Sequence, residues 1–206
     1  MNCNDACEKI GIIGGTFNPI HLGHLMLAQD AKNYFELSKV LFIPAGVSYF
    51  KDAKEVLSVK HRLNMTKLAI EDNPDFELST IETDREGNSY TYETLEILKK
   101  ENPNTCYYFI IGADTLFKMD TWKYPERIFK NCVVCCKKRN DFVDIELEDQ
   151  IKYLENKYNA DVRLMDIPQV GISSTYIRES IKNGYNTRYY LKDEVLNYIK
   201  ENKLYY

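Results

Sequence analysis

Short apolar runs alternate along this chain with longer segments in which apolar residues recur at helical spacing. The runs are continuously apolar, which is typical of strands that are buried on both faces of a sheet. Strands that alternate with helices predict a parallel sheet covered by helices, and right-handed crossovers make such a sheet doubly wound. We therefore expect an α/β fold of this kind, with helices at its C-terminal end. Ligands of these sheets bind beyond the carboxyl ends of the strands.

The same pattern predicts the bounds of the individual elements. Strands are expected at residues 10–13, 40–43, 76–78, 107–111, 132–136 and 162–165. Helices are expected at residues 21–35, 58–71, 91–100, 145–158, 174–183 and 192–202, with a further short helix ending at Ile128 and with Ser58 as an N-cap. The 206 residues are enough for one sizeable core and contain no internal repeat or clear linker, so we predict a single domain over residues 1–206.

Charge and cysteine content limit the classes of partner and compartment. The formal net charge is −4, whereas proteins that bind nucleic acid usually carry a basic excess, so we expect no nucleic-acid partner. No apolar run approaches the roughly 20 residues that span a bilayer, and the first residues lack the pattern of a secretory signal. We therefore expect no membrane association and a cytoplasmic protein whose six cysteines, at positions 3, 7, 106, 132, 135 and 136, are reduced thiols. The last three lie in an apolar run, which favours buried structural cysteines over metal ligands.

The strongest local signal is the string GGTFNPIHLGH at residues 14–24, which begins where the first expected strand ends. Its two glycines remove side chains where the backbone approaches a ligand or takes a positive φ. His21 and His24 are three residues apart, so both rings can project from one face of the expected helix, and Gly23 keeps that face open. Two imidazoles beside a helix N-terminus can donate to phosphate oxygens and stabilise a phosphoryl transition state. The alternative is a pair of capping or solvated histidines.

A second signal is the string ISSTYIR at residues 172–178, which also follows a strand and opens a helix. Ser173 or Ser174 can cap this helix. Free N–H groups, hydroxyls and the guanidinium of Arg178 then make a second cradle for phosphate. The alternative is a well-capped surface helix with a solvated arginine.

Together these two motifs resemble those of the nucleotidyltransferases related to class I aminoacyl-tRNA synthetases. Within that superfamily the chain resembles bacterial nicotinate-nucleotide adenylyltransferases. Residues 85–95, REGNSYTYETL, are similar to the family segment R-x-G-x-S-Y-T-x-D-T-L, and residues 109–114, FIIGAD, with Trp122 are similar to F-I-x-G-x-D…W. The resemblance runs from Ile10 to the C-terminus. It implies a Rossmann-like fold and, for NAD biosynthesis, transfer of AMP from ATP to nicotinate mononucleotide with Mg²⁺ and release of pyrophosphate.

The resemblance also implies roles for individual positions. The expected catalytic residues are His21, His24 and Arg178. The expected ATP-binding residues are Gly14, Gly15, Thr16, Phe17, Lys51, Gly112, Asp114, Ile172, Ser173, Ser174 and Thr175. The expected mononucleotide-binding residues are Thr91, Trp122 and Lys137, with Thr16 and Phe17 on the same side. No side chain is expected to bind a metal directly.

Two of these assignments also have reasons of their own. Asp114 follows a strand, where a carboxylate is suited to accept hydrogen bonds from ribose hydroxyls. Trp122 is the only tryptophan and lies in the polar setting of residues 120–123, where an indole can stack on a flat ring. A half-buried core tryptophan is the alternative, just as Thr91 also reads as an ordinary N-terminal helix residue.

The chain departs from the family pattern in three places. Residues 48–51, SYFK, replace Pro-Pro-His-Lys, which keeps the basic end at Lys51 but loses the prolines and the histidine. Lys123 stands where an aromatic is common. Lys137 stands where arginine is usual and lacks the bidentate fork of a guanidinium. These changes concern the nicotinate pocket more than the AMP-transfer core.

We expect direct in-line attack of the mononucleotide phosphate on the α-phosphorus of ATP, without a general base or a covalent enzyme intermediate. Catalysis then comes from positioning and charge neutralisation. Pantetheine-phosphate adenylyltransferase, nicotinamide-mononucleotide adenylyltransferase and a cytidylyltransferase are alternatives in the same superfamily. A non-catalytic nucleotide- or RNA-binding module is the alternative from another class. The choice of nicotinate over nicotinamide rests on the resemblance, and a homo-oligomer stays open.

Overall fold

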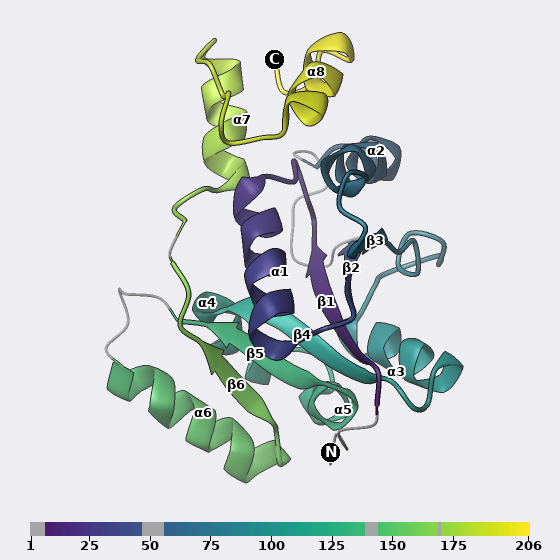
Figure 1. Cartoon of the computed structure of the whole chain (residues 1–206), viewed down its shortest axis with the longest axis vertical. Helices are drawn as coiled ribbons and strands as arrows, with labels where there is room; N and C mark the ends of the chain where they lie inside the picture. Colours follow the sequence, from purple (N-terminus) through teal and green to yellow (C-terminus); the bar gives the residue numbers. More distant parts are fainter. Residues whose placement is uncertain (1–6, 47–55, 139–143, 169) are drawn as a thin grey trace. The chain divides into compact units, whose positions relative to one another are not determined.

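The computed structural model describes residues 7–46, 56–138, 144–168 and 170–206. Within them the chain forms a six-stranded sheet in the order β3-β2-β1-β4-β5-β6 (Figure 1). The pairings of β1 with β4, β4 with β5 and β5 with β6 are parallel. The strands are β1 (Lys9–Gly15), β2 (Lys39–Pro44), β3 (Phe76–Leu78), β4 (Cys106–Gly112), β5 (Val133–Lys137) and β6 (Val162–Met165). This strand order is that of a doubly wound Rossmann-like sheet, so the predicted fold class is confirmed.

Helices connect the strands and follow the last of them. They are α1 (Leu22–Phe35), α2 (Val59–Ile70), α3 (Thr91–Glu101), α4 (Ala113–Leu116), the 3₁₀ helix η1 (Met119–Thr121), α5 (Pro125–Asn131), α6 (Asp144–Tyr158), α7 (Ser174–Lys182) and α8 (Asp193–Glu201). None of the helices in the described ranges is both long and apolar enough to cross a membrane.

The chain divides into two compact units. The first comprises residues 1–13, 30–40 and 90–169, as far as they are described. Its centre is β4, in which all six residues from Cys106 to Ile111 are buried, together with the buried residues of β5. Because neighbouring residues of a strand point to opposite faces, this burial means that both faces are covered, as the continuous apolar runs predicted. Around the strands, α3 packs against α5 and α5 against α6.

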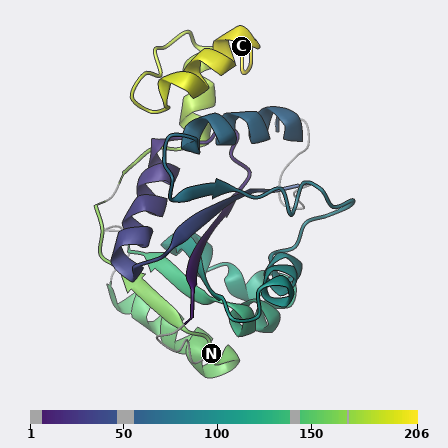
Figure 2. The same ribbon diagram turned by 45° about the vertical axis from the view of Figure 1, so that its right-hand side comes forward.

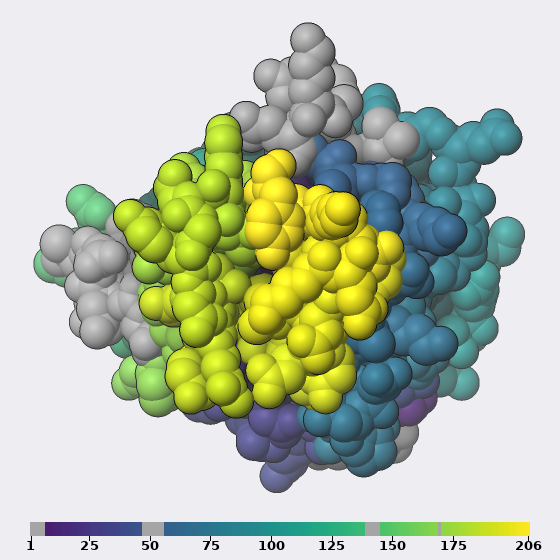
Figure 3. All heavy atoms as spheres, turned by 90° about the horizontal axis from the view of Figure 1, so that it is seen from above, coloured from purple at the N-terminus to yellow at the C-terminus, as the bar shows by residue number. Residues whose placement is uncertain are grey.

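The second unit comprises residues 14–29, 41–89 and 170–206, as far as they are described. Its C-terminal helix α8 packs against α2, and Figure 2 shows the two helices side by side. Seen from above in Figure 3, the yellow C-terminal segment lies against the blue segment that contains α2. The buried face of α8 consists of Val195, Leu196 and Ile199, at the spacing of one helical face.

Several local predictions need correction. His21 lies just before α1 rather than inside it, and α5 continues beyond Ile128 to Asn131. Ser58 occupies the N-cap position of α2, but its side chain makes no capping hydrogen bond. The short helices α4 and η1 were not predicted, because three or four residues are too few to show a helical period.

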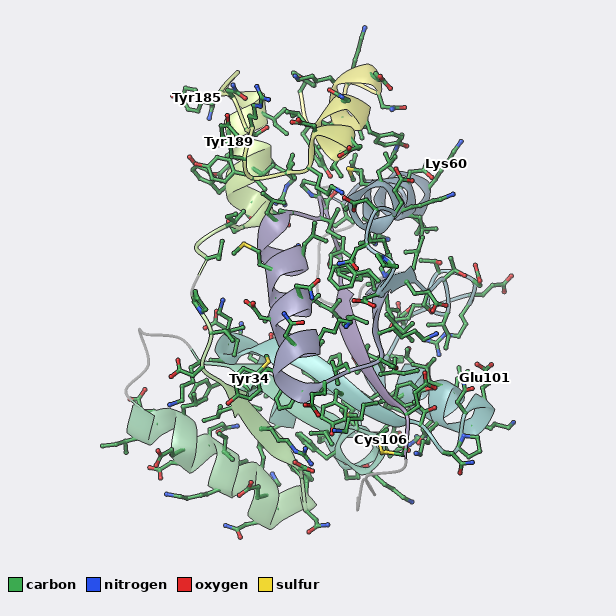
Figure 4. The ribbon with its side chains drawn as sticks, viewed as in Figure 1. Tyr34, Lys60, Glu101, Cys106, Tyr185 and Tyr189 are labelled. Carbon is green, nitrogen blue, oxygen red and sulfur yellow. A yellow bond between two sulfur atoms is a disulfide. The ribbon has the colours of Figure 1, made fainter. Side chains whose placement is uncertain are left out.

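The prediction of six reduced thiols is wrong for two cysteines. Cys7 and Cys106 form a disulfide, with Cα atoms 6.1 Å apart. Cys106 lies at the start of β4 (Figure 4), and its N–H donates to the carbonyl of Glu8. This pairing brings together two residues 99 positions apart, which no local pattern reveals. Cys3 lies outside the described residues.

The other three cysteines agree with the prediction. Cys132, Cys135 and Cys136 are free and buried, at or in β5. Burial raises the pKa of all three thiols, for Cys136 to about 12, so they stay protonated and unreactive at neutral pH.

Candidate active site

A tight turn follows β1 and carries the first motif. Phe17 takes a left-handed backbone conformation with φ 48°, which costs a residue with a Cβ about 1 kcal/mol or more. Burial of its ring holds it there, because the side chain is 2% exposed and contacts the rings of His24 and Phe42. A Cβ on Gly15 would lie 2.9 Å from the Phe17 ring. Gly15 is therefore required by this ring and not by a positive φ, which neither Gly15 nor Gly14 has.

A buried arginine also anchors the turn that follows β1. Arg62 is 2% exposed and lies in α2. Its guanidinium donates to three backbone carbonyls: those of Thr16 at 2.9 Å, Leu57 at 3.2 Å and Gly46 at 3.2 Å. It thereby ties the turn to the segments on either side of residues 47–55. The role of Arg62 was not predictable from the sequence, because an arginine in an amphipathic helix is usually solvated.

The two histidines of the motif form a stacked pair. Their ring centroids are 3.7 Å apart, and the N–H of His21 donates to Nδ1 of His24 at 3.2 Å. An Nδ1 that accepts a hydrogen bond carries no proton, so the proton of His24 lies on Nε2. The carbonyl of His21 accepts from the N–H of His24, the first bond of α1. The two rings therefore stack at the N-terminus of α1, although only His24 belongs to the helix.

His21 is the more buried partner, with a side chain that is 7% exposed. Its Nδ1 has no hydrogen-bond partner among the described residues. Burial lowers its pKa to about 4, so the ring is neutral at pH 7. Gly23 makes room for it, since a Cβ there would lie 3.0 Å from Nδ1 of His21 and 3.6 Å from Cβ of Ile172. The sequence had suggested that Gly23 leaves this face open. Instead, His21 and Ile172 fill it.

The buried ring of His21 predicts an acid-sensitive contribution to stability. Its pKa is about 4 in the folded chain and about 6.5 when unfolded, so its contribution is complete above pH 6.5 and is lost as the pH falls toward 4. We expect the wild type to lose about 2–3 kcal/mol more than His21→Asn between pH 7 and pH 4.5. Urea unfolding of both proteins at the two pH values measures this difference. Identical pH dependence would show that the ring is not buried in its neutral form.

The second motif opens α7 and contacts the first. Ser173 caps the helix by accepting from the N–H of Tyr176 at 3.2 Å. The hydroxyl of Ser174 donates to the carbonyl of Pro19 at 2.8 Å. Arg178 donates to the carbonyl of Asn18 at 3.0 Å. The two stretches of sequence are therefore in direct contact, although these bonds join residues that are 155 and 160 positions apart.

This arrangement suits a polyanion. The N-termini of α1 and α7 carry the partial positive charge of their helix dipoles, although the N–H of Leu22 at the start of α1 already donates to the carbonyl of Tyr190. His24 adds an imidazole donor, and Arg178 adds a full charge. The other Arg178 nitrogen donates to the hydroxyl of Thr175 at 3.4 Å, which fixes the guanidinium beside the helix mouth. No group of three or more His, Cys, Asp or Glu that could hold a metal occurs among the described residues.

Five further predicted site residues, Thr91, Gly112, Asp114, Trp122 and Lys137, belong to the first unit. Gly112 is the N-cap residue of α4, Asp114 lies in its first turn, and Thr91 is the first residue of α3. A Cβ on Gly112 would meet nothing within 4 Å, so the protein alone does not require glycine there. Lys137 ends β5 and donates to the carbonyl of Pro168 at 2.6 Å. Lys51 lies outside the described residues, as do the other residues of the altered segment 48–51.

Trp122 directly follows η1 and is half-buried, with its ring edge-on to that of Phe109 and the ring centres 6.3 Å apart. Asp120, which the sequence indicated only as part of a polar setting, lies in η1 and anchors it to α6. Its carboxylate accepts from Tyr153 and Lys157 at 3.0 Å each, and from Tyr158. The hydrogen bonds of Tyr158 and Lys157 lower the pKa of Asp120, so it stays ionised. Lys123 occupies a position where the family often has an aromatic residue. Its Nζ lies 4.1 Å from the centre of the Tyr90 ring.

Comparisons with known proteins identify the family of the chain. The cytidylyltransferase-like family model matches residues 12–180. A probable nicotinate-nucleotide adenylyltransferase of Lachnoclostridium phytofermentans is 40% identical over 198 residues, which cover 96% of this chain and 99% of the relative. A protein of the same description from Enterococcus faecalis is 39% identical over 96% of this chain and 85% of its own length.

Among solved structures, the nicotinic acid mononucleotide adenylyltransferase of Plasmodium falciparum complexed with NaAD has a TM-score of 0.80 at 21% identity, covering 96% of this chain and 97% of that one. The same enzyme complexed with APC has a TM-score of 0.77. At this identity the likeness concerns the fold. The family follows from the sequence relatives, whose identity extends over nearly the whole chain: the protein belongs to the nicotinate-nucleotide adenylyltransferases, a family of nucleotidyltransferase enzymes within the cytidylyltransferase-like group.

Proposed function

We propose that this enzyme transfers AMP from ATP to nicotinate mononucleotide, giving nicotinate adenine dinucleotide and pyrophosphate. The observation that carries the proposal is the contact between the two phosphate motifs. Ser174 and Arg178 bond to the carbonyls of Pro19 and Asn18, immediately before the histidine pair. We infer that the two helix N-termini, an imidazole and a guanidinium bind one triphosphate between them. The membership of the family supplies the choice of ATP and of nicotinate mononucleotide.

The roles of the side chains follow from their protonation. His21 is neutral at pH 7, and His24 is held as the tautomer with its proton on Nε2. His21 therefore contributes no positive charge at pH 7, and His24 offers the N–H of its Nε2 as a donor. Arg178 brings the formal charge, beside the N–H groups of α7. The acceptor phosphate is already an anion, so positioning and electrostatic stabilisation are sufficient and no general base is needed.

Magnesium enters this scheme as part of the substrate. Mg²⁺ keeps several waters and is usually bound through phosphates and one or two carboxylates. The described residues include no cluster that could form a protein cage for it. We propose that ATP arrives as its Mg²⁺ complex and that Ser174, Thr175 and Arg178 contact the triphosphate and not the ion.

The pyridine nucleotide is assigned to the first unit. Trp122 offers a half-buried ring for stacking, on a turn that Asp120 anchors to α6. Thr91 offers a hydroxyl at the N-terminus of α3. Adenosine is assigned to Gly112 and Asp114 at the start of α4. Phe17 is buried, so only its backbone is offered to a ligand.

A panel of substrates tests the proposal. ATP and CTP are each combined with nicotinate mononucleotide, nicotinamide mononucleotide and phosphopantetheine, and release of pyrophosphate is measured. We expect the highest kcat/KM for ATP with nicotinate mononucleotide. A preference for the amide would correct the acceptor alone, a preference for CTP would correct the donor, and no release with any pair would contradict the enzyme assignment.

A further inference from the structure

The side chain of Tyr205, in the segment after α8, points into the second unit. After α8 the backbone is left-handed at Lys203, with φ 49°, and at Tyr205, with φ 67°. Leu204 is 7% exposed and its N–H donates to the carbonyl of Ile199, whereas Tyr206 is 72% exposed. Tyr185 and Tyr189 follow α7 and project outward (Figure 4). Tyr205 thus differs from these other tyrosines of the second unit, and the sequence offered no reason to single it out.

The Tyr205 hydroxyl contacts the first phosphate motif. It donates to Oδ1 of Asn18 at 2.9 Å. Asn18 is 3% exposed, and the same oxygen accepts from the N–H of Leu57 at 3.3 Å. The carbonyl of Asn18 in turn accepts from Arg178 at 3.0 Å. A continuous path of hydrogen bonds therefore runs from the C-terminus through one buried residue to the guanidinium of the second motif.

The environment of the hydroxyl keeps it a donor. Burial raises the pKa of Tyr205 well above its usual range, although the nearby guanidiniums of Arg178 and Arg62 oppose the shift. The phenol is therefore protonated throughout the working range of pH. Because Asn18 is fixed through its side chain by Tyr205 and Leu57, its backbone carbonyl offers Arg178 a rigid acceptor.

We propose that Tyr205 is a positioning residue for AMP transfer, which holds Asn18 and, through its carbonyl, orients Arg178 toward the triphosphate. This inference rests on the proposed function, in which Arg178 contacts the phosphates of ATP. It makes the last turn of the chain part of the support of the active site. A phenylalanine at the same position would keep the packing of the ring and lose only the hydrogen bond.

Tyr205→Phe and the neighbouring Tyr206→Phe form a matched pair for the test. We expect Tyr205→Phe to lower kcat/KM for ATP about fivefold, the effect of one net hydrogen bond. Tyr206→Phe should stay within twofold of the wild type, because its side chain is exposed. Rates are measured by pyrophosphate release below the Tm of the least stable variant, so that unfolding does not contribute. An unchanged rate in Tyr205→Phe would overturn the proposal.

A double-mutant cycle with Arg178→Lys separates positioning from a general loss of stability. A lysine lacks the fork that bonds to Asn18, so Tyr205→Phe should cost little further activity in that background. The losses of Tm should instead add. Additive losses of activity would overturn the positioning role while leaving the proposed function intact. Absence of pyrophosphate release from the wild type with ATP and nicotinate mononucleotide would instead mark failure of the proposed function itself.

Discussion

His24→Ala is expected to lower the rate of AMP transfer by about 10²-fold or more, the usual cost of removing a preorganised donor to a transition state. The structure explains why this histidine and not its neighbour should carry the larger chemical effect. The N–H of His21 occupies Nδ1 of His24, which fixes the proton on Nε2. His21 has a buried ring whose substitution also disturbs stability. The readout is kcat for pyrophosphate release at saturating ATP and nicotinate mononucleotide.

The third histidine supplies the control. Nδ1 of His61 lies 2.9 Å from the hydroxyl of Tyr198, in the packing of α2 against α8. His61→Ala removes an imidazole of the same second unit without touching the phosphate motifs, so turnover should stay within about twofold while Tm falls slightly. Near-normal turnover in His24→Ala, or equal losses in the two variants, would remove His24 from the catalytic assignment.

The parts of the fold that have a local sequence pattern were predicted correctly. The strands were predicted because consecutive buried residues of β4 and β5 give continuous apolar runs. The mouth of α7 was predicted because Ser173 is a strong capping residue and does cap the helix. The histidine pair was predicted from a spacing of three, although His21 reaches His24 from outside α1.

The support of the site was not predictable in this way. Arg62 bonds to the carbonyl of Thr16, which is 46 positions away in the sequence. The partners of Asp120 are 33 to 38 positions away, and Tyr205 bonds to Asn18, which is 187 positions away. Nothing near them in the sequence distinguishes them from other charged or aromatic residues. The disulfide between Cys7 and Cys106 was missed for the same reason. The two motifs can be recognised in the sequence, whereas the groups that hold them in place depend on the tertiary fold.

Arg62→Met is expected to lower the free energy of unfolding by about 3 kcal/mol, because three backbone carbonyls lose their donor in a buried site. Methionine keeps the unbranched stem and fills much of the same volume, so the loss reports the guanidinium and not a large cavity. For a chain of this length the change corresponds to a fall in Tm of about 6–12 °C. Activity should fall as well, since Arg62 holds the carbonyl of Thr16 in the turn that leads to the histidines.

Arg188→Met is the matched control for this change. Arg188 is exposed and lies 4.0 Å from Asp193, a separation at which a surface ion pair contributes little. Its substitution should alter the free energy of unfolding by no more than about 0.5 kcal/mol. Urea unfolding of both variants and the wild type gives the comparison. A loss below about 1 kcal/mol in Arg62→Met would mean that water satisfies the three carbonyls, since an unpaired buried acceptor typically costs more than that. In that case the buried ring of Phe17, and not the guanidinium of Arg62, would determine the conformation of the turn after β1.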